Sequence, residues 1–139
     1  SFCMREGDLE KHNLKLQAVY AQIQARQQRW ESLFVEDARS IVVAYGTMAR
    51  IARSVVKQLR EKGKKVGLIR PITVWPFPTQ AFEKLKSSPV KKFVVTEMSY
   101  GQMVEDVRLT LAGKYPVSFV GRAAGGIPSE ESIARQLEY

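Results

Sequence analysis

The sequence predicts an α/β protein, a three-layer α/β/α sandwich with a mostly parallel sheet, preceded by a long N-terminal helix. Apolar runs at residues 41–45 and 93–96 are typical of buried strands, and residues 66–69 and 117–120 predict two further strands. The intervening segments carry apolar residues at steps of three and four, which is typical of helices. Because strands and helices alternate along the chain, we expect parallel strands covered by helices on both faces.

Residues 8–34 predict one long helix, because Asp8 can cap its start and no Gly or Pro interrupts the segment. An apolar seam of heptad-like spacing runs along this helix. The seam consists of Leu9, His12, Leu16, Val19, Ile23, Arg26, Trp30 and Leu33, with His12 and Arg26 as interruptions. We expect the helix to pack against another surface, in its own domain or in a neighbouring chain. The predicted organisation is a linker helix at residues 1–38 and an α/β domain at residues 39–139.

Residues 40–71 predict a strand, a helix and a second strand, and the rest of the chain is organised around this unit. The turn at Gly46 and Thr47 leads into the helix, and Gly63 ends it. The apolar stripe of the helix consists of Met48, Ile51, Ala52, Val55, Val56 and Leu59. A helical crossover between two apolar strands indicates a right-handed parallel βαβ unit.

Three prolines at residues 70–78 predict an extended, irregular loop, since proline lacks the amide donor that a central strand needs. Trp75 and Phe77 in this loop are too apolar to lie freely in water. We therefore expect them to cover the end of the sheet or to enter the surface of a partner. Together with Trp30, they are the candidate interface residues.

The remaining segments predict three helices around two strands. Thr79 is expected to cap a short helix, and Ser129 a final helix whose Glu131 lies four residues before Arg135. Strands are expected at residues 93–96 and 117–120. The helix between them has the apolar stripe Tyr100, Met103, Val104, Val107 and Leu111.

The composition excludes several classes of protein. The formal net charge is +8, but the 22 Lys and Arg mostly occupy helix faces opposite the apolar stripes, and no aromatic residues interleave with them. This pattern indicates solvated faces and argues against nucleic-acid binding.

No apolar run approaches the roughly 20 residues that span a bilayer, and the chain does not open on a signal peptide. Cys3 is the only cysteine, which excludes an internal disulfide. We expect a cytoplasmic protein that does not enter a membrane.

The carboxyl ends of the predicted parallel strands indicate a weak candidate anion site. Gly46, Thr47, Arg70 and Arg122 follow or end these strands, and helix amides and guanidinium groups can hold phosphate or carboxylate. In the alternative, which we favour, Gly46 makes a tight turn, Thr47 caps a helix and the arginines pair with Glu97 or with another chain.

No catalytic or metal-binding residue is assigned. The turn at Gly46 has neither Gly-x-Gly-x-x-Gly nor a phosphate-loop lysine. Ser99 lacks the Gly-x-Ser-x-Gly elbow, and His12 is the only histidine, so that it has no second histidine with which to ligate a metal. The sequence therefore assembles no acid, base and nucleophile.

Three stretches resemble the C-terminal part of the alpha subunit of 2-oxoacid:ferredoxin oxidoreductases. They are Val43–Arg50, Gly63–Pro78 and Gly121–Pro128, and the resemblance covers roughly residues 25–139. The run Arg-Pro-Ile-Thr-Val-Trp-Pro-Phe-Pro at residues 70–78 is its specific part. The Tyr-Gly-Thr turn at residues 45–47 is shared more widely with transketolase C-terminal-like domains of thiamine-diphosphate enzymes. The 2-oxoisovalerate and 2-oxoglutarate enzymes look most similar.

The resemblance implies a transketolase C-terminal-like domain in which one edge strand can run antiparallel. The whole enzyme of such a family oxidatively decarboxylates a 2-oxoacid to an acyl-coenzyme A and passes the electrons to ferredoxin. Thiamine diphosphate, magnesium, iron–sulfur clusters and coenzyme A are implied for the full complex, and none for this fragment. The implied partners are the beta subunit and the iron–sulfur or gamma subunit.

The expected role is thus an assembly domain, inactive in isolation. Two alternatives stay open at this point. One is an α/β module that binds coenzyme A or another anion. The other is the equivalent domain of a 2-oxoacid dehydrogenase or a transketolase. The residues do not distinguish which 2-oxoacid the parent enzyme uses.

Overall fold

A five-stranded sheet with the strand order β1-β3-β2-β4-β5 forms the centre of the protein. The structure is a computed structural model that describes residues 5–138, so Cys3 lies outside the described residues. Its elements in chain order are α1 (Asp8–Arg26), β1 (Trp30–Leu33), β2 (Ser40–Val43), α2 (Gly46–Glu61), β3 (Val66–Pro71), α3 (Thr79–Glu83), β4 (Lys92–Glu97), α4 (Met103–Leu111), β5 (Val117–Gly121) and α5 (Glu130–Leu137).

The sheet is parallel except at one edge. β2 lies at its centre and pairs parallel with β3 and with β4, and β4 pairs parallel with β5. β1 runs antiparallel along the outer side of β3. The four predicted strands are therefore confirmed, and so are the mostly parallel sheet and the antiparallel edge strand that the resemblance implied.

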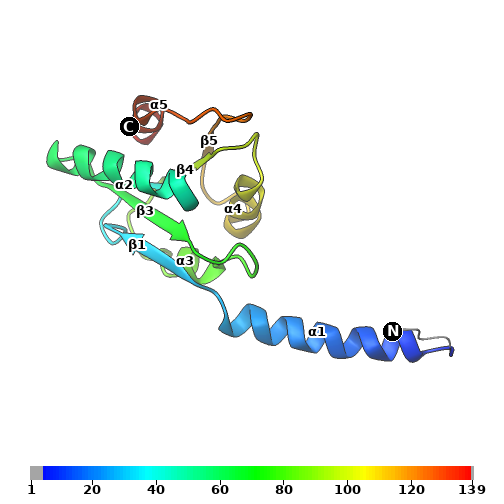
Figure 1. The fold of residues 1–139 in the computed structure, drawn as a ribbon. Helices are drawn as coiled ribbons and strands as arrows, with labels where there is room; N and C mark the ends of the chain where they lie inside the picture. Colours follow the sequence, from blue (N-terminus) through cyan, green and yellow to red (C-terminus); the bar gives the residue numbers. More distant parts are fainter. Residues whose placement is uncertain (1–4, 139) are drawn as a thin grey trace.

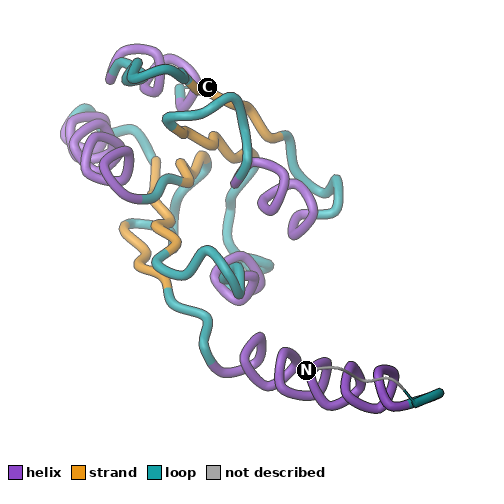
Figure 2. The backbone as a smooth tube through the Cα atoms, turned by 45° about the vertical axis from the view of Figure 1, so that its right-hand side comes forward, coloured by secondary structure: helices purple, strands orange, loops and turns teal. Residues whose placement is uncertain are grey.

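Helices cover both faces of the sheet, so the predicted three-layer sandwich is also confirmed. The core under α2 and α5 contains Val42 and Leu68 of the central strands, with Met48, Val55, Ile133 and Leu137 of the helices. The core under α3 and α4 contains Ile41 and Ile69 of the same strands, with Phe82, Val104, Val107 and Leu111 of the helices. Alternate strand residues thus face opposite layers, as the two-residue strand period requires. Figure 2 shows the strands running between the helices.

The prediction of one helix from Asp8 to Phe34 is wrong, because α1 ends at Arg26 and residues 30–33 form β1. Pairing of Trp30 with Pro71 and of Leu33 with Leu68 gives β3 a hydrogen-bonded neighbour on its outer side. Trp30 packs against one core and Leu33 against the other. As a strand, this segment packs one apolar side chain on each face of the sheet, and this packing favours a strand over a longer α1. The division at residue 38 stays a prediction, and β1 of the sheet precedes it.

α1 projects from the body of the domain (Figure 1). None of its residues, all of which the structure describes, is buried. The apolar seam is largely in contact with solvent, since Leu9 and Val19 are exposed. Within the described residues, the apolar seam of α1 therefore has little surface to pack against.

Arg60 of α2 forms hydrogen bonds that hold the connection between β1 and β2, residues 34–39, against the start of β3. Its guanidinium donates to both carboxylate oxygens of Asp37, at 2.7 and 3.1 Å, and to the carbonyls of Phe34 and Val66, at 2.8 and 2.7 Å. The Phe34 carbonyl also passes close to Gly67, where an added Cβ would lie 2.8 Å from that oxygen. Gly67 therefore permits the close approach of this connection to β3.

Three predicted details at the starts of α1, α3 and α4 are wrong, and one at the start of α5 is confirmed. Asp8 is the first residue of α1 and not its cap, since Gly7 occupies the N-cap position. Thr79 is the first residue of α3 and not its cap, since the Gln80 amide donates to the Oε1 atom of Gln28 at 3.1 Å. Tyr100 is 86% exposed and precedes α4. Ser129 caps α5 as predicted, its Oγ atom accepting from the Ser132 amide at 3.2 Å.

Candidate functional site

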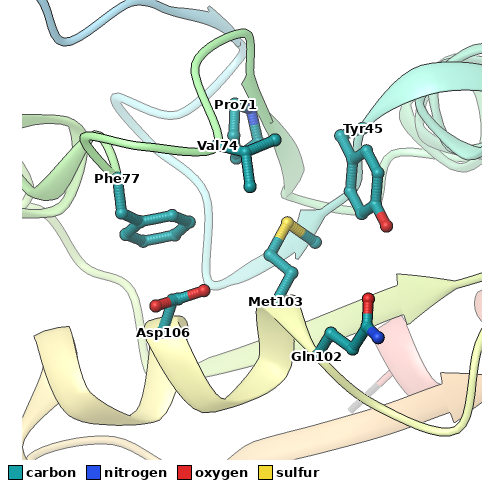
Figure 3. A pocket seen from close by; sticks show the side chains of 7 residues that line it. All are labelled: Tyr45, Pro71, Val74, Phe77, Gln102, Met103 and Asp106. Atoms are coloured by element: carbon teal, nitrogen blue, oxygen red, sulfur yellow. The ribbon is translucent and has the colours of Figure 1, made fainter.

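A small cavity lies beyond the carboxyl ends of β2 and β3, between the loop after β3 and the start of α4. Its volume is about 110 Å³, and its lining residues are Tyr45, Pro71, Val74, Phe77, Gln102, Met103 and Asp106. Figure 3 shows Gln102, Met103 and Asp106 projecting from α4 and its start, opposite Pro71, Val74 and Phe77. A drug-sized ligand needs about 300 Å³ or more. This cavity therefore suits a single side chain or a group of a few atoms.

Asp106 provides the ionisable group of this cavity. Its side chain lies beneath the Phe77 ring in Figure 3 and is half-buried. Burial raises the pKa of the Asp106 carboxyl, and the nearby acids Glu97 and Glu105 raise this pKa further. The surroundings of Asp106 therefore stabilise its protonated form more than water does.

Glu97, at the end of β4, is fully buried and caps the N-terminus of α4. Its carboxyl oxygens accept hydrogen bonds from the amides of Met103 at 2.8 Å, Val104 at 3.1 Å and Gln102 at 3.2 Å. These amides have no partner within the helix, so Glu97 satisfies donors that would otherwise be buried without one. The cap fixes α4, and with it Met103 and Asp106, against the carboxyl ends of the strands.

The alternative in which arginines pair with Glu97 is wrong, because Glu97 is occupied by backbone amides. Arg70 instead donates from Nη1 to Oε2 of Glu31, its partner on β1, at 3.2 Å. Arg122 donates from Nη1 to the carbonyl of Ile127 within its own loop, at 3.5 Å.

The four candidate anion-site residues do not form one site. Gly46 and Thr47 are the exposed first residues of α2, and the N-cap is Tyr45, so Thr47 is not a cap. The positive φ of Gly46, 56°, is consistent with the tight turn. Arg70 lies on β3 and Arg122 follows β5, three positions away in the sheet, which corresponds to about 14 Å.

Arg70 lies beside residues that are distant from it in the sequence. Arg53 of α2 donates from Nη2 to the same Glu31 oxygen at 2.9 Å. Arg50 lines the same hollow, together with Ala49, Arg53, Arg70 and Glu31. The signal in the sequence is the three-residue spacing of Arg50 and Arg53 on a helix that follows a buried strand, and this spacing also fits a solvated helix face.

The three candidate interface residues differ in exposure. Trp75 is 55% exposed, and its ring meets that of Tyr20 of α1 edge to face, with 5.7 Å between centroids. Phe77 is half-buried and stacks on Phe82 at 5.8 Å. Trp30 is half-buried, with the Lys84 ammonium 4.8 Å from its ring centroid. Trp75 therefore offers the largest apolar surface of the three.

Two further kinds of site are absent among residues 5–138. Within that range, His, Cys, Asp and Glu side chains form no group of three that can hold a metal ion. None of the helices described there combines the length and the apolar character needed to cross a membrane.

Known proteins match both the sequence and the fold. The chain is 42% identical over 130 residues to the ketoisovalerate oxidoreductase subunit VorB of Methanothermobacter thermautotrophicus, covering 94% of this chain and 36% of that protein. It is 38% identical over 109 residues to the 2-oxoglutarate synthase subunit KorA of Methanocaldococcus jannaschii, covering 78% of this chain and 29% of that protein. The chain thus spans about a third of the length of these relatives.

Two solved structures share the fold. One is 2-oxoglutarate:ferredoxin oxidoreductase from Magnetococcus marinus with 2-oxoglutarate, coenzyme A and succinyl-CoA bound. It matches with a TM-score of 0.78 and 19% identity, over 96% of this chain and 23% of that one. The other is a split-gene transketolase in an inactive beta4 tetramer, with a TM-score of 0.65 and 18% identity, over 78% of this chain and 40% of that one.

The sheet order, its antiparallel edge and these fold matches define an α/β domain of the transketolase C-terminal type. The sequence model of pyruvate:ferredoxin oxidoreductase core domain II matches residues 38–133. The chain belongs to that family. The resemblance to 2-oxoacid:ferredoxin oxidoreductases is thereby confirmed.

Proposed function

We propose that this chain is the assembly domain at the C-terminal end of the alpha subunit of a thiamine-diphosphate-dependent 2-oxoacid:ferredoxin oxidoreductase. The observation that carries the proposal is the 42% identity to a ketoisovalerate oxidoreductase subunit over 94% of the chain. The parent enzyme oxidatively decarboxylates a 2-oxoacid, joins the acyl group to coenzyme A and passes the electrons to ferredoxin. Since identity to 2-oxoglutarate synthase subunits is 38% or lower, a branched 2-oxoacid is the first substrate to test.

In this proposal the chemistry belongs to the assembled complex. Thiamine diphosphate, magnesium, the iron–sulfur clusters and coenzyme A are held there, with the beta and the iron–sulfur or gamma subunits as partners in the cytoplasm. This domain supplies a rigid sheet and surfaces for assembly. Its own ionisable groups at the strand ends have structural partners, since Glu97 caps α4 and Arg70 pairs with Glu31.

The exposed apolar residues of α1 and of the loop after β3 support the assembly role. Trp75 and Tyr20 join these two elements through their ring contact. The exposed large apolar residues of the two elements are Leu9, Leu14, Val19, Tyr20, Ile72, Val74 and Trp75. A neighbouring subunit or domain that covers them would gain the free energy of burying apolar surface.

The composition of the native complex tests this proposal. The protein that contains this chain is purified from its cells through an affinity tag, and the proteins and cofactors recovered with it are identified. We expect a second subunit with bound thiamine diphosphate, together with iron–sulfur protein. Recovery of a lipoyl-bearing acyltransferase would favour a 2-oxoacid dehydrogenase instead, and recovery of the parent chain alone without thiamine diphosphate would contradict the proposal.

A further inference from the structure

Three arginines surround a hollow on the α2 side of the sheet. Arg50 and Arg53 lie three residues apart on α2, so they share one side of this helix. Arg70 lies two residues after Leu68 on β3, so both side chains face the same side of the sheet, where Leu68 packs in the core under α2. The hollow has a volume of about 420 Å³ and lies between β1, β3 and the first half of α2. It is separate from the cavity at Asp106.

The positive charges at this hollow exceed the negative charge. Glu31 is the acid that lines it, and one oxygen of Glu31 accepts from both Arg53 and Arg70. Arg50 makes no hydrogen bond or ion pair to the part of the chain that the structure describes, residues 5–138. The Nε atom of Arg70 is buried and has no hydrogen-bond partner among those residues. Three guanidinium groups and one carboxylate leave two positive charges uncompensated.

We propose that this hollow binds the phosphate group of a ligand. Planar guanidinium groups present paired N–H donors whose spacing matches the oxygens of phosphate. Arg53 and Arg70 are held in place by Glu31 but use only one N–H each in that contact, so most of their donors stay available. The excess of two positive charges matches a phosphate dianion better than a single carboxylate. This inference does not depend on the proposed function.

Glu31 has two opposing effects on such a ligand. Its hydrogen bonds orient Arg53 and Arg70, but its negative charge repels an anion that enters the hollow. In Glu31→Gln the side-chain amide oxygen can still accept from the arginines while the charge is lost. A phosphate site therefore predicts that Glu31→Gln binds the anion more tightly than the wild type.

Calorimetric titration of the full chain with inorganic pyrophosphate tests the proposal, with the ionic strength held constant by chloride. We expect saturable binding to one site. Arg50→Gln should weaken the binding about tenfold, because a hydrogen bond to a charged group is lost. Arg50 is exposed and unpaired among the described residues, so this variant should fold like the wild type. Arg70→Gln should weaken binding at least as much, and Glu31→Gln should tighten it several-fold.

Matched controls separate a site from general charge attraction. Arg108→Gln and Arg135→Gln remove exposed arginines of α4 and α5, each of which pairs with a glutamate as Arg53 and Arg70 do. They lower the net charge by the same amount as Arg50→Gln, and we expect them to leave pyrophosphate binding unchanged. The proposal is overturned if neither the wild type nor Glu31→Gln shows saturable binding, or if the control variants weaken binding as much as Arg50→Gln.

Discussion

The backbone amide of Met103 donates a hydrogen bond of 2.8 Å to the buried side chain of Glu97. The contact joins the last residue of β4 to the first residue of α4. The amides of Gln102 and Val104 donate to the same carboxyl group. One acidic side chain thus satisfies three amides at the start of the helix and fixes α4 against the carboxyl ends of the strands.

Replacement of Glu97 by alanine is expected to lower the free energy of unfolding by about 2 kcal/mol or more, because buried amides lose their acceptors. Urea denaturation at neutral pH measures this change. Glu105→Ala is the control, since Glu105 is an exposed acid on α4, the helix that Glu97 caps, and its contact is the ion pair with Arg108. Its effect should stay within about 0.5 kcal/mol. Equal effects of the two substitutions would show that the Glu97 cap does not stabilise the fold.

The raised pKa of Asp106 predicts that the wild type becomes less stable relative to the variant Asp106→Asn as the pH rises. Because its pKa is raised above the ordinary 3.8 in the folded chain, the folded state holds this proton more tightly than the unfolded state. Stability is therefore lost as the pH rises from 3.8 through the higher folded pKa. Asp106→Asn removes this loss, and we expect the variant to be more stable than the wild type at neutral pH.

The pH dependence separates this effect from a change in packing. Urea denaturation of the wild type and of Asp106→Asn, followed on both sides of pH 3.8, should show the gain vanishing at the acidic end. A gain that is the same at every pH would refute the electrostatic explanation.

The lowered pKa of Asp37 predicts that this residue stabilises the fold at neutral pH and that the stabilisation is lost in acid. Its hydrogen bonds to Arg60 lower the pKa of the Asp37 carboxyl below 3.8, and the charges of Arg60 and Lys65 contribute in the same direction. The stabilisation is present above pH 3.8 and is lost as the pH falls through the lower folded pKa. Asp37→Asn should therefore be less stable than the wild type at neutral pH, with the difference disappearing in acid.

Glu36→Gln is the control for Asp37→Asn. Glu36 is a neighbouring exposed acid that makes no hydrogen bond or ion pair to residues 5–138, for which the structure gives positions. Its unfolding curves should follow those of the wild type. If Glu36→Gln destabilises the chain as much as Asp37→Asn, the contact with Arg60 is not the cause.

β2 and β4 were predictable from the sequence because a strand buried on both faces is a continuous apolar run. β1 was not, because Glu31 and Ser32 are exposed and only Trp30 and Leu33 are partly buried. The spacing of those two apolar residues also fits a helix. What decides in favour of a strand is pairing with β3, which lies far along the chain, and local patterns do not contain that information.

The site was less predictable than the fold. The polar residues at the strand ends were identified, but not their partners. The sequence suggests Glu97 as an ion-pair partner of the arginines, whereas its carboxyl group accepts hydrogen bonds from backbone amides at the start of α4. The sequence predicts Arg70 and Arg122 at one site, although the strand order places Arg70 beside Glu31 and Arg53. Strand order follows from long-range packing, which the spacing of residues does not encode.

Trp75→Ala tests the interface prediction within the native complex. We expect lower recovery of partner subunits with the parent protein, because the exposed indole would lose its buried contacts in the assembly. In the isolated chain, the free energy of unfolding should fall by no more than about 1.5 kcal/mol, because only the ring contact with Tyr20 is lost. Leu109→Ala, which truncates an exposed apolar residue of α4, is the control. Unchanged subunit recovery in Trp75→Ala would remove Trp75 from the interface.

The most direct test of the central claim is reduction of methyl viologen by the purified complex that contains this chain, with different 2-oxoacids as substrates. Viologen dyes accept electrons in place of ferredoxin. We predict dye reduction that requires both a 2-oxoacid and coenzyme A, fastest with 2-oxoisovalerate. Absence of dye reduction with every 2-oxoacid, in a complex that retains thiamine diphosphate and its iron–sulfur clusters, would contradict the account.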